Sequence, residues 1–408
     1  MAAVPRLRTN RVLVIATEAW PLAGRISIAL AKVGFRVAAV SPSGSIVRKI
    51  QAVEAHYRYQ FWAGLWSIKM AIENWSPDLL VCCDDEAIRQ LHHLHRRASE
   101  PGGCSALVAL IEASLGDPKG FLPAREKSRF ISLVQSTCGV RCPKTVVIPK
   151  DHKRECQIGS LSYPIVVKAD ESHGGMGVRL ANNKDEAETA ISDLANSLRW
   201  PTSMAGSVGS KVFEWMPRRR RTLCLQEYIT GRAANVAVMC YEGRVLAGIC
   251  VEVVETQCKF GPASVIRVID NAEMTAVAET LVRRFGLCGF IGFDFILDSA
   301  NQAWLIEMNP RATSTCALSF GNGADLAAAM FSRVARSEVI LSPSQVTEST
   351  IVLFPHELIR SRNSPYLVSP MHAVSHDVPW EELELVRACL GYALDNGWVD
   401  RMRRKIRI

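Results

Sequence analysis

Two carboxylates and an amide near the end of a predicted β-hairpin could hold a metal ion. The segment from Phe293 to Arg311 reads as two apolar strands around a turn at residues 299–302, and in-register pairing places Asp294 across from Glu307. Opposed carboxylates repel each other, and a bound cation would relieve that repulsion. Oxygen ligands without histidine or thiol are typical of Mg²⁺ or Mn²⁺ bound jointly with substrate phosphates. The apolar flanks FIGF and LIEM argue against a solvated acidic pair on an exposed hairpin.

Arg311 continues the same strand beyond this pair. Because side chains alternate along a strand, Glu307, Asn309 and Arg311 share one face. Pro310 ends regular pairing and leaves Arg311 at the exit of the strand, where a ligand could approach. A planar fork of donors suits an oxygen-rich group that gains charge, so Arg311 is a candidate catalytic residue. The alternative is a structural salt bridge to Asp294 or Glu307.

A strand, a lysine and a glycine-rich loop follow one another in YPIVVKADESHGGMGV, residues 163–178. Lys168 ends the strand, and Gly174, Gly175 and Gly177 lie in the loop. Glycines let backbone amides approach a phosphate closely, and a lysine supplies a compact positive charge. The lysine precedes the glycines and no GK[ST] follows, so this is no P-loop. A tight turn between two strands has the same pattern, and these residues leave both interpretations open.

A third candidate is QEYITG (226–231), at the end of the predicted strand TLCLQEYI. Such a segment could offer backbone groups and a carboxylate to the edge of an adenine. A strand that ends at the surface has the same composition, so the motif alone does not decide.

The elements that must position these residues follow two rhythms. A strand at 11–17, a helix to about residue 32 and a strand at 35–42 give a βαβ pattern, and a strand at 78–85 leads into a helix at 86–97. This pattern predicts a parallel, Rossmann-like sheet, although the first turn, TEAWPLAG, lacks the GxGxxG fingerprint. Hairpins follow later, one turning at Glu242-Gly243 and one near 299–302. The predicted fold class is α/β and α+β.

Composition excludes several classes of protein. With 48% hydrophobic and 22% charged residues in 408, the chain is neither disordered nor membrane-spanning. Nine of its positive charges lie at 218–221 and 401–407; removing them from the net charge of +8 leaves −1. A neutral body argues against nucleic-acid binding, and the arginine run at 218–221 is interpreted as a solvated loop. The short apolar run after the basic start is no signal peptide, so we expect a cytoplasmic protein.

Cysteine and histidine residues give no clear metal pattern. The 13 cysteines show no CxxC spacing and have apolar neighbours, which is typical of small buried hydrophobes in a reducing compartment. His92, His93 and His95 follow Cys82 and Cys83, but no second ligand pair has zinc spacing. A zinc site is therefore disfavoured.

Taken in order, four motifs resemble the ATP-grasp superfamily, which includes biotin carboxylase, carbamoyl phosphate synthetase and D-alanine–D-alanine ligase. They are AREKSRFISLVQSTCGVRCPKTVVI, YPIVVKADESHGGMGV, LQEYITG and GFDFILDSANQAWLIEMNPR, within about residues 120–335. The resemblance implies a Rossmann-like preATP-grasp domain at 1–118, a two-lobed ATP-grasp domain at 119–340 and a small C-terminal α/β segment at 341–408.

The same resemblance implies ATP and Mg²⁺ (or Mn²⁺) as cofactors and assigns residues to them. The implied ATP-binding residues are Lys127, Lys168, Gly174, Gly175, Gly177, Gln226, Glu227 and Ile229; the implied metal ligands are Asp294, Glu307 and Asn309; and Arg311 faces the transferred phosphate. Two departures weaken parts of this set. Ala233 and Ala234 stand where several relatives carry a ribose-binding glutamate, and Asp294 is shorter than the glutamate often found there.

Most members of the superfamily activate a carboxylate as an acyl phosphate, which implies an ATP-dependent carboxylate–amine ligase. One alternative is a carboxylase-type enzyme that activates bicarbonate or carbamate, although no biotin-attachment motif is visible. Another is a non-catalytic nucleotide-binding protein, against which the intact lysine, carboxylate and asparagine set argues. The expected partners are small-molecule carboxylate and amine substrates, with no nucleic acid and no membrane, and a homodimer is left open. The sequence names neither the acid nor the amine.

Overall fold

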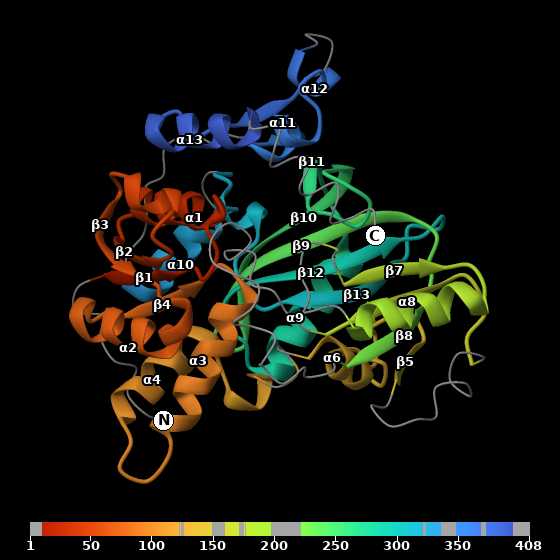
Figure 1. The fold of residues 1–408 in the computed structure, drawn as a ribbon, viewed down its shortest axis with the longest axis horizontal. Coiled ribbons are helices and arrows are strands. Elements are labelled where there is room, and N and C mark those ends of the chain that lie inside the picture. Colours follow the sequence, from red (N-terminus) through yellow and green to blue (C-terminus); the bar gives the residue numbers. More distant parts are fainter. Residues whose placement is uncertain are drawn as a thin grey trace.

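The structure, a computed structural model, describes residues 10–121, 123, 126–148, 160–170, 175, 177–196, 222–320, 324–335, 348–368 and 373–394. Gly174 of the predicted phosphate loop, the arginine run at 218–221 and the basic residues at 401–407 lie outside these residues. The described strands form three sheets, and the first belongs to the N-terminal part of the chain. In Figure 1 that part is red to orange.

The N-terminal sheet is parallel, as the βαβ pattern predicts. Its strands are β1 (Arg11–Ile15), β2 (Arg36–Ser41), β3 (Val53–Arg58) and β4 (Leu79–Cys82), in the order β3-β2-β1-β4. The helices beside it are α1 (Leu22–Lys32), α2 (Gly64–Trp75), α3 (Asp85–Ala98) and α4 (Ser105–Leu115). The sequence did not reveal β3, because this edge strand, VEAHYR, has a single buried residue. The strand order reverses between β1 and β4, so loops from both strand ends meet there.

A small antiparallel sheet forms the second layer. Its strands are β5 (Thr145–Ile148), β6 (Ile165–Ala169), β7 (Val178–Ala181) and β8 (Leu223–Glu227), in the order β5-β8-β6-β7. Helix α8 (Lys184–Asn196) packs on β6 and β7, and α6 (Lys127–Val134) reaches from this sheet to the large one. Figure 1 shows β5, β7, β8 and α8 together, away from the N-terminal sheet.

The third sheet has seven strands in the order β13-β12-β9-β10-β11-β14-β15. They are β9 (Arg232–Tyr241), β10 (Arg244–Thr256), β11 (Ala263–Ile269), β12 (Gly289–Leu297), β13 (Ala303–Asn309), β14 (Thr350–Leu353) and β15 (Ser375–Asp377). The remaining helices are α9 (Ala272–Phe285), α10 (Leu326–Ala335), α11 (His356–Arg360), α12 (Pro365–Val368) and α13 (Leu383–Leu394), with short 3₁₀ helices η1 (Ile46–Lys49), η2 (Phe61–Ala63), η3 (Pro118–Gly120) and η6 (Ser314–Ala317). The C-terminal strands β14 and β15 thus extend this sheet, and the boundaries at 118 and 340 stay predictions.

Both predicted hairpins are present, and each has a register shift, which in the β9–β10 hairpin lies between Val245 and Ala247. Glu242 and Gly243 form the β9–β10 turn with φ of 49° and 71°, the left-handed geometry that tight hairpins favour. In the β12–β13 hairpin Asp294 pairs with Glu307, as predicted, but Phe295 then pairs with Leu305. The extra residue is Ile306, a β-bulge. In-register pairing through the whole hairpin was therefore wrong beyond Asp294.

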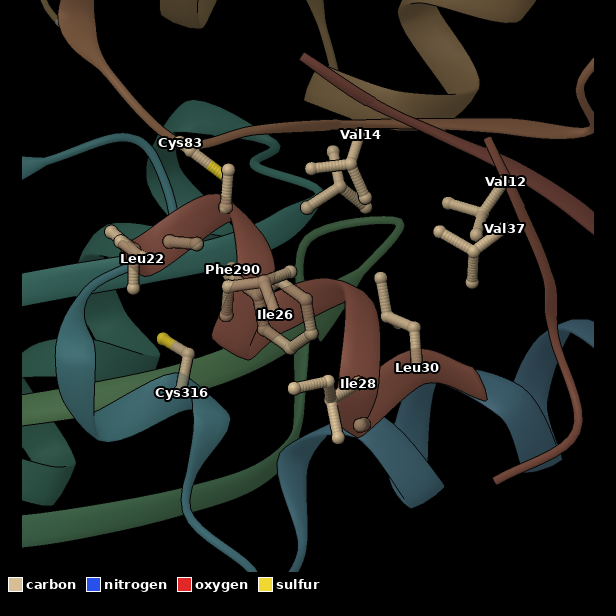
Figure 2. Close-up of a cluster of buried hydrophobic side chains, with 14 of the residues drawn as sticks. Val12, Val14, Leu22, Ile26, Ile28, Leu30, Val37, Cys83, Phe290 and Cys316 are labelled. Atoms are coloured by element: carbon tan, nitrogen blue, oxygen red, sulfur yellow. The ribbon is translucent and has the colours of Figure 1, made fainter. Parts of the chain in front are cut away.

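One hydrophobic core joins the N-terminal sheet to the large sheet. Side chains of α1, such as Ile26 and Leu30, share a buried cluster with Phe290 of β12 and Cys316 of η6. Figure 2 shows Phe290 and Cys316 lying against the α1 side chains. A closely packed core deforms little, so this one fixes the position of the loops of the N-terminal sheet relative to the C-terminal end of β13.

The described part of the chain contains no helix long and apolar enough to cross a membrane. Most cysteines in it are buried, as their apolar neighbours predict, and Cys104 and Cys138 are exposed.

Candidate functional site

Lys127 is the first residue of α6, and a buried aspartate fixes where that helix begins. Asp170, just beyond β6, accepts hydrogen bonds from Ser128 N (3.0 Å) and Ser128 Oγ (2.7 Å). A carboxylate at a helix N-terminus satisfies donors that have no intrahelical partner and complements the helix dipole. This contact ties α6 to β6 and so brings Lys127 and Lys168 to the same site. The sequence motifs gave no role to Asp170.

Lys127 forms an ion pair with Glu307 on β13, with 2.7 Å between Nζ and Oε1. Burial alone would lower the pKa of Lys127, but the Glu307 carboxylate, with help from Asp85, raises it above its ordinary value. Lys127 is therefore protonated and positively charged at neutral pH. The two residues, 180 positions apart in the sequence, were predicted separately as a nucleotide contact and a metal ligand.

Asp294 on β12 is held by two amides. Asn235 Nδ2 donates to Asp294 Oδ1 over 2.6 Å, and Asn309 Nδ2 donates to Asp294 Oδ2 over 2.8 Å. Burial and the opposed carboxylate of Glu307 raise the pKa of Asp294, and the two hydrogen bonds partly offset that rise. The predicted electrostatic conflict between Asp294 and Glu307 is therefore present.

Lys168 is the penultimate residue of β6 and faces the bulge of β13. Its Nζ contacts the carbonyl oxygen of Ile306 at 3.4 Å, a long hydrogen bond that exists because the bulge turns this extra residue out of the ladder. Burial lowers the pKa of Lys168, and Glu307 only partly opposes the effect. Lys168 is thus a buried cation with weaker compensation than Lys127.

Arg311 contacts the N-terminal part of the chain, which the sequence did not predict. Its Nε donates to Asp85 Oδ1 over 2.9 Å, and its Nη2 lies 3.5 Å from Asp85 Oδ2 and 3.3 Å from Asn309 Oδ1. Burial disfavours the charged guanidinium, but Asp85 and its neighbours raise the pKa of Arg311. The alternative salt bridge to Asp294 or Glu307 is wrong in its partner, since Asp85 takes that place.

Asp85 is positioned by the loops at the reversal of the N-terminal sheet. Its neighbour Asp84 caps α3 through Ala87 N (2.8 Å) and also accepts from Thr17 N (2.6 Å) and Thr17 Oγ1 (2.9 Å), in the loop after β1. Ala312 N donates to Cys82 O over 3.0 Å, which joins the β13 exit to the end of β4. The N-terminal sheet therefore helps to orient Arg311.

The glycine loop and the strand end at 226–231 are described in part. Gly175 has φ of 76°, and a Cβ there would lie 2.2 Å from the carbonyl oxygen of Phe260, so the close approach requires glycine. Gly177 O accepts from Ala169 N over 2.9 Å at the base of the loop. These contacts fix both residues near the end of β6.

The predicted adenine-binding residues lie at the end of β8. Gln226 is buried, and its Nε2 donates to Thr145 Oγ1 over 3.0 Å. Glu227 is exposed, and its backbone N donates to Lys144 O over 2.9 Å. Ile229, just beyond the strand, is half-buried. A role of these residues in binding adenine stays a prediction.

The donor set fits a hard divalent cation. Asp294, Glu307 and Asn309 offer only oxygen ligands on neighbouring strands, which suits Mg²⁺ or Mn²⁺ that also binds substrate phosphates. No group of three or more His, Cys, Asp and Glu side chains suited to a metal exists among the described residues. His92 instead stacks on Phe121 and His95 pairs with Glu112 at 2.8 Å. Two carboxylates with one amide are a small set, and phosphates would complete it.

Comparisons with known proteins bear on the fold that holds these residues. Residues 125–315 match the family model of the ATP-grasp domain. No curated protein sequence matches the chain.

Solved structures share the fold over most of the chain. An L-amino acid ligase from Bacillus licheniformis has a TM-score of 0.55 at 14% identity, covering 80% of this chain and 75% of that one. The N5-carboxyaminoimidazole ribonucleotide synthetase purK, in complex with ADP, has a TM-score of 0.59 at 13% identity, covering 84% and 81%. The biotin carboxylase domain of Hydrogenobacter thermophilus 2-oxoglutarate carboxylase, a dimer with MgADP and bicarbonate, has 0.57 at 18%, covering 82% and 71%. The predicted fold class, Rossmann-like part and two-lobed part included, is confirmed.

Proposed function

We propose that this chain is an ATP- and Mg²⁺-dependent ligase that activates a small-molecule carboxylate for attack by an amine and releases ADP and phosphate. One observation carries the proposal: three cations, Lys127, Lys168 and Arg311, surround two opposed carboxylates, Asp294 and Glu307. The cations suit the phosphates of ATP, and the carboxylates suit the cation that accompanies them.

The reaction proceeds in two displacements. A carboxylate oxygen of the substrate attacks the γ-phosphorus, the bond to the ADP oxygen breaks, and an acyl phosphate forms. The amine nitrogen then attacks the acyl carbon, phosphate leaves, and the nitrogen loses a proton. Lys127 and Lys168 bind phosphate oxygens and hold them in line, and the Arg311 fork stabilises the charge that develops on the transferred group. Asp294, Glu307 and Asn309 would hold the divalent cation, which would neutralise phosphate charge there.

The site residues divide by role in this proposal. Arg311 acts on the transferred phosphate, the two lysines with Gly174, Gly175 and Gly177 bind phosphates, and Gln226, Glu227 and Ile229 border the adenine. Small molecules are the proposed partners, without nucleic acid, and the cytoplasm is the proposed location. The solved structures with this fold include an L-amino acid ligase and a domain with bound bicarbonate, so bicarbonate activation is the second candidate.

An ADP-release assay separates these possibilities. Purified protein with ATP and Mg²⁺ is given pooled carboxylic acids, then pooled acids with amines, and then bicarbonate, and products are identified by mass. We expect ADP release that requires an acid and a product that joins acid and amine. Release with bicarbonate alone would favour the carboxylase-type reaction. Nucleotide binding without release under any condition would replace the ligase by a non-catalytic nucleotide-binding protein.

A further inference from the structure

Asn235 lies on β9 directly beside Asp294 of β12, outside the four motifs that carry the ATP-grasp resemblance. Its Nδ2 donates to Asp294 Oδ1 over 2.6 Å. An ionised carboxylate only accepts hydrogen bonds, so the amide must present its nitrogen to Asp294. That requirement fixes the orientation of the Asn235 carbonyl oxygen as well.

Asn235 Oδ1 has no donor among the residues that the structure describes. The atom is also buried. A buried acceptor that loses its hydrogen bond costs about 1–3 kcal/mol, and native structures keep few such groups without a reason. An acceptor of this kind beside two carboxylates therefore suggests a partner that arrives from outside the chain.

The second amide at Asp294 shows what is distinctive about the first. Asn309 also donates to Asp294, but its Oδ1 accepts from Arg311 Nη2 at 3.3 Å. Among the described residues no such cation contacts Asn235 Oδ1.

A hydrated divalent cation matches this vacant acceptor. Mg²⁺ and Mn²⁺ in phosphate sites keep several waters, whose protons need acceptors in the surrounding protein. A group that orients a ligating carboxylate and also serves the hydrated ion affects metal affinity without binding the nucleotide. Asn235 offers both functions on one planar amide.

We propose that Asn235 is a positioning residue of the cation site, whose Nδ2 orients Asp294 and whose Oδ1 is an acceptor for the hydrated cation. The proposal rests on the proposed function, because it assumes that a divalent cation binds with the nucleotide. It adds a residue from a third strand to the metal site and a reason for asparagine at position 235.

The test is a Mn²⁺ titration followed by electron paramagnetic resonance, with ADP present. Asn235→Leu removes both polar groups at similar volume, Asn235→Asp keeps an acceptor, and Asn74→Leu, on an exposed face of α2, is the control. We expect Asn235→Leu to weaken Mn²⁺ binding about tenfold or more. ADP affinity in EDTA should be unchanged, Asn235→Asp should recover most of the Mn²⁺ affinity, and Asn74→Leu should match wild type.

Two failures are distinguishable. Wild-type protein that binds no Mn²⁺ with ADP would overturn the proposed function together with this inference. Wild-type binding matched by Asn235→Leu would overturn the role of Asn235 alone, as would equal losses of Mn²⁺ and of metal-free ADP binding. If Asn235→Leu does not fold, Asn235→Ala takes its place in the same titration, with the same expected loss.

Discussion

Two carboxylates, the buried Glu357 of α11 and the half-buried Asp294 of β12, have opposite surroundings. Glu357 is fully buried and has four donors on its two oxygens. Arg360 Nε and Ser264 Oγ each donate to Oε2 over 2.7 Å, while Arg360 Nη2 (2.5 Å) and Ser364 Oγ donate to Oε1. Hydrogen bonds outweigh burial there and lower the pKa of Glu357.

Asp294 has two donors and a carboxylate as its neighbour, and its pKa is raised. Around it Lys168 makes one long contact of 3.4 Å, and Asn235 Oδ1 lacks a donor among the described residues. Both regions bury charge, but only the Glu357 cluster satisfies it internally. Unsatisfied charge is tolerated where a ligand completes it, so the difference separates a structural ion pair from a binding site.

The largest expected effect is a loss of activity from a substitution in the site around Asp294. Glu307→Gln removes a carboxylate that opposes Asp294 and pairs with Lys127. We expect ADP release to fall by about 10³-fold or more, since the cation site and the position of Lys127 are both lost. Lost pairing and relieved repulsion act in opposite directions, so the melting temperature should change little. Near-normal turnover in limiting Mg²⁺ would contradict the metal assignment.

The Asp294–Glu307 pair was inferred from an assumed turn at residues 299–302, and the structure has that pair. Next to the turn, however, the strands pair one residue differently, with Leu297 opposite Ala303, and the bulge at Ile306 restores the predicted register at Asp294. The parallel N-terminal sheet was readable from the sequence, because its apolar strands alternate with helices along the chain.

Contacts between distant segments could not be read in this way. Asn235 reaches Asp294 only because β9 pairs with β12, and Asp85 reaches Arg311 only because α1 packs against the large sheet. The bulge at Ile306 depends on packing that no local pattern encodes. Asp170 carried a weaker signal, two residues after Lys168, but its partner Ser128 lies 42 residues earlier.

The next prediction tests whether Arg311 is a catalytic residue or a structural one, like Arg360 of the Glu357 cluster. Arg311→Lys keeps the charge but loses the fork that now engages Asp85 and Asn309. If Arg311 acts on the transferred phosphate, kcat and kcat/KM for ATP should fall together, by about 10²-fold, with KM little changed.

Asp85→Asn is the matched control, since it removes the partner in the N-terminal part and keeps the arginine. Smaller losses of kcat in Asp85→Asn than in Arg311→Lys would agree with a catalytic arginine. A lowered melting temperature in both variants, with normal kcat, would make Arg311 a structural residue like Arg360.

In the Glu357 cluster, Glu357→Gln should lower the free energy of unfolding and leave ADP release unchanged. Removing one partner of a buried, hydrogen-bonded ion pair costs about 3–5 kcal/mol, and Arg360 keeps Glu255 at 3.3 Å and Ser364 Oγ at 3.4 Å as weaker partners. Urea unfolding at pH 7 measures this loss. ADP release per folded molecule should equal that of wild type, and a selective loss of activity would place Glu357 in the functional site.

The pH dependence of Glu357 gives this loss a direction. Since its folded pKa is lowered, its contribution to stability is present above its unfolded pKa of about 4.3 and disappears as the pH falls through the folded value. The difference in stability between wild type and Glu357→Gln should therefore shrink in acid. A constant difference from pH 7 to pH 3 would contradict the ion-pair account.

The smallest expected effect concerns His356, which, like Asn235, has a buried polar atom without a hydrogen-bond partner among the described residues. His356 begins α11 and stacks on Trp20, with ring centroids 5.5 Å apart, and its Nδ1 is buried without a partner in the part of the chain that the structure describes. Burial, and secondarily Arg25, lowers the pKa of His356 to about 4. Trp20 and His356 line a small cavity, and Asp377, which pairs with Arg25, lines it too.

The sign of the His356 effect follows from proton binding. Below pH 6.5 the unfolded chain protonates this histidine, whereas the folded chain keeps it neutral down to about pH 4. As the pH decreases from 6.5 to about 4, the free energy of unfolding should therefore decrease, by at most about 1.4 kcal/mol per pH unit from this group. His356→Phe keeps an aromatic ring against Trp20 and removes the titration, so its unfolding free energy should depend less steeply on pH than that of wild type. Equal slopes would mean that His356 gains a partner in solution, and this region would then be as fully satisfied as the Glu357 cluster beside it.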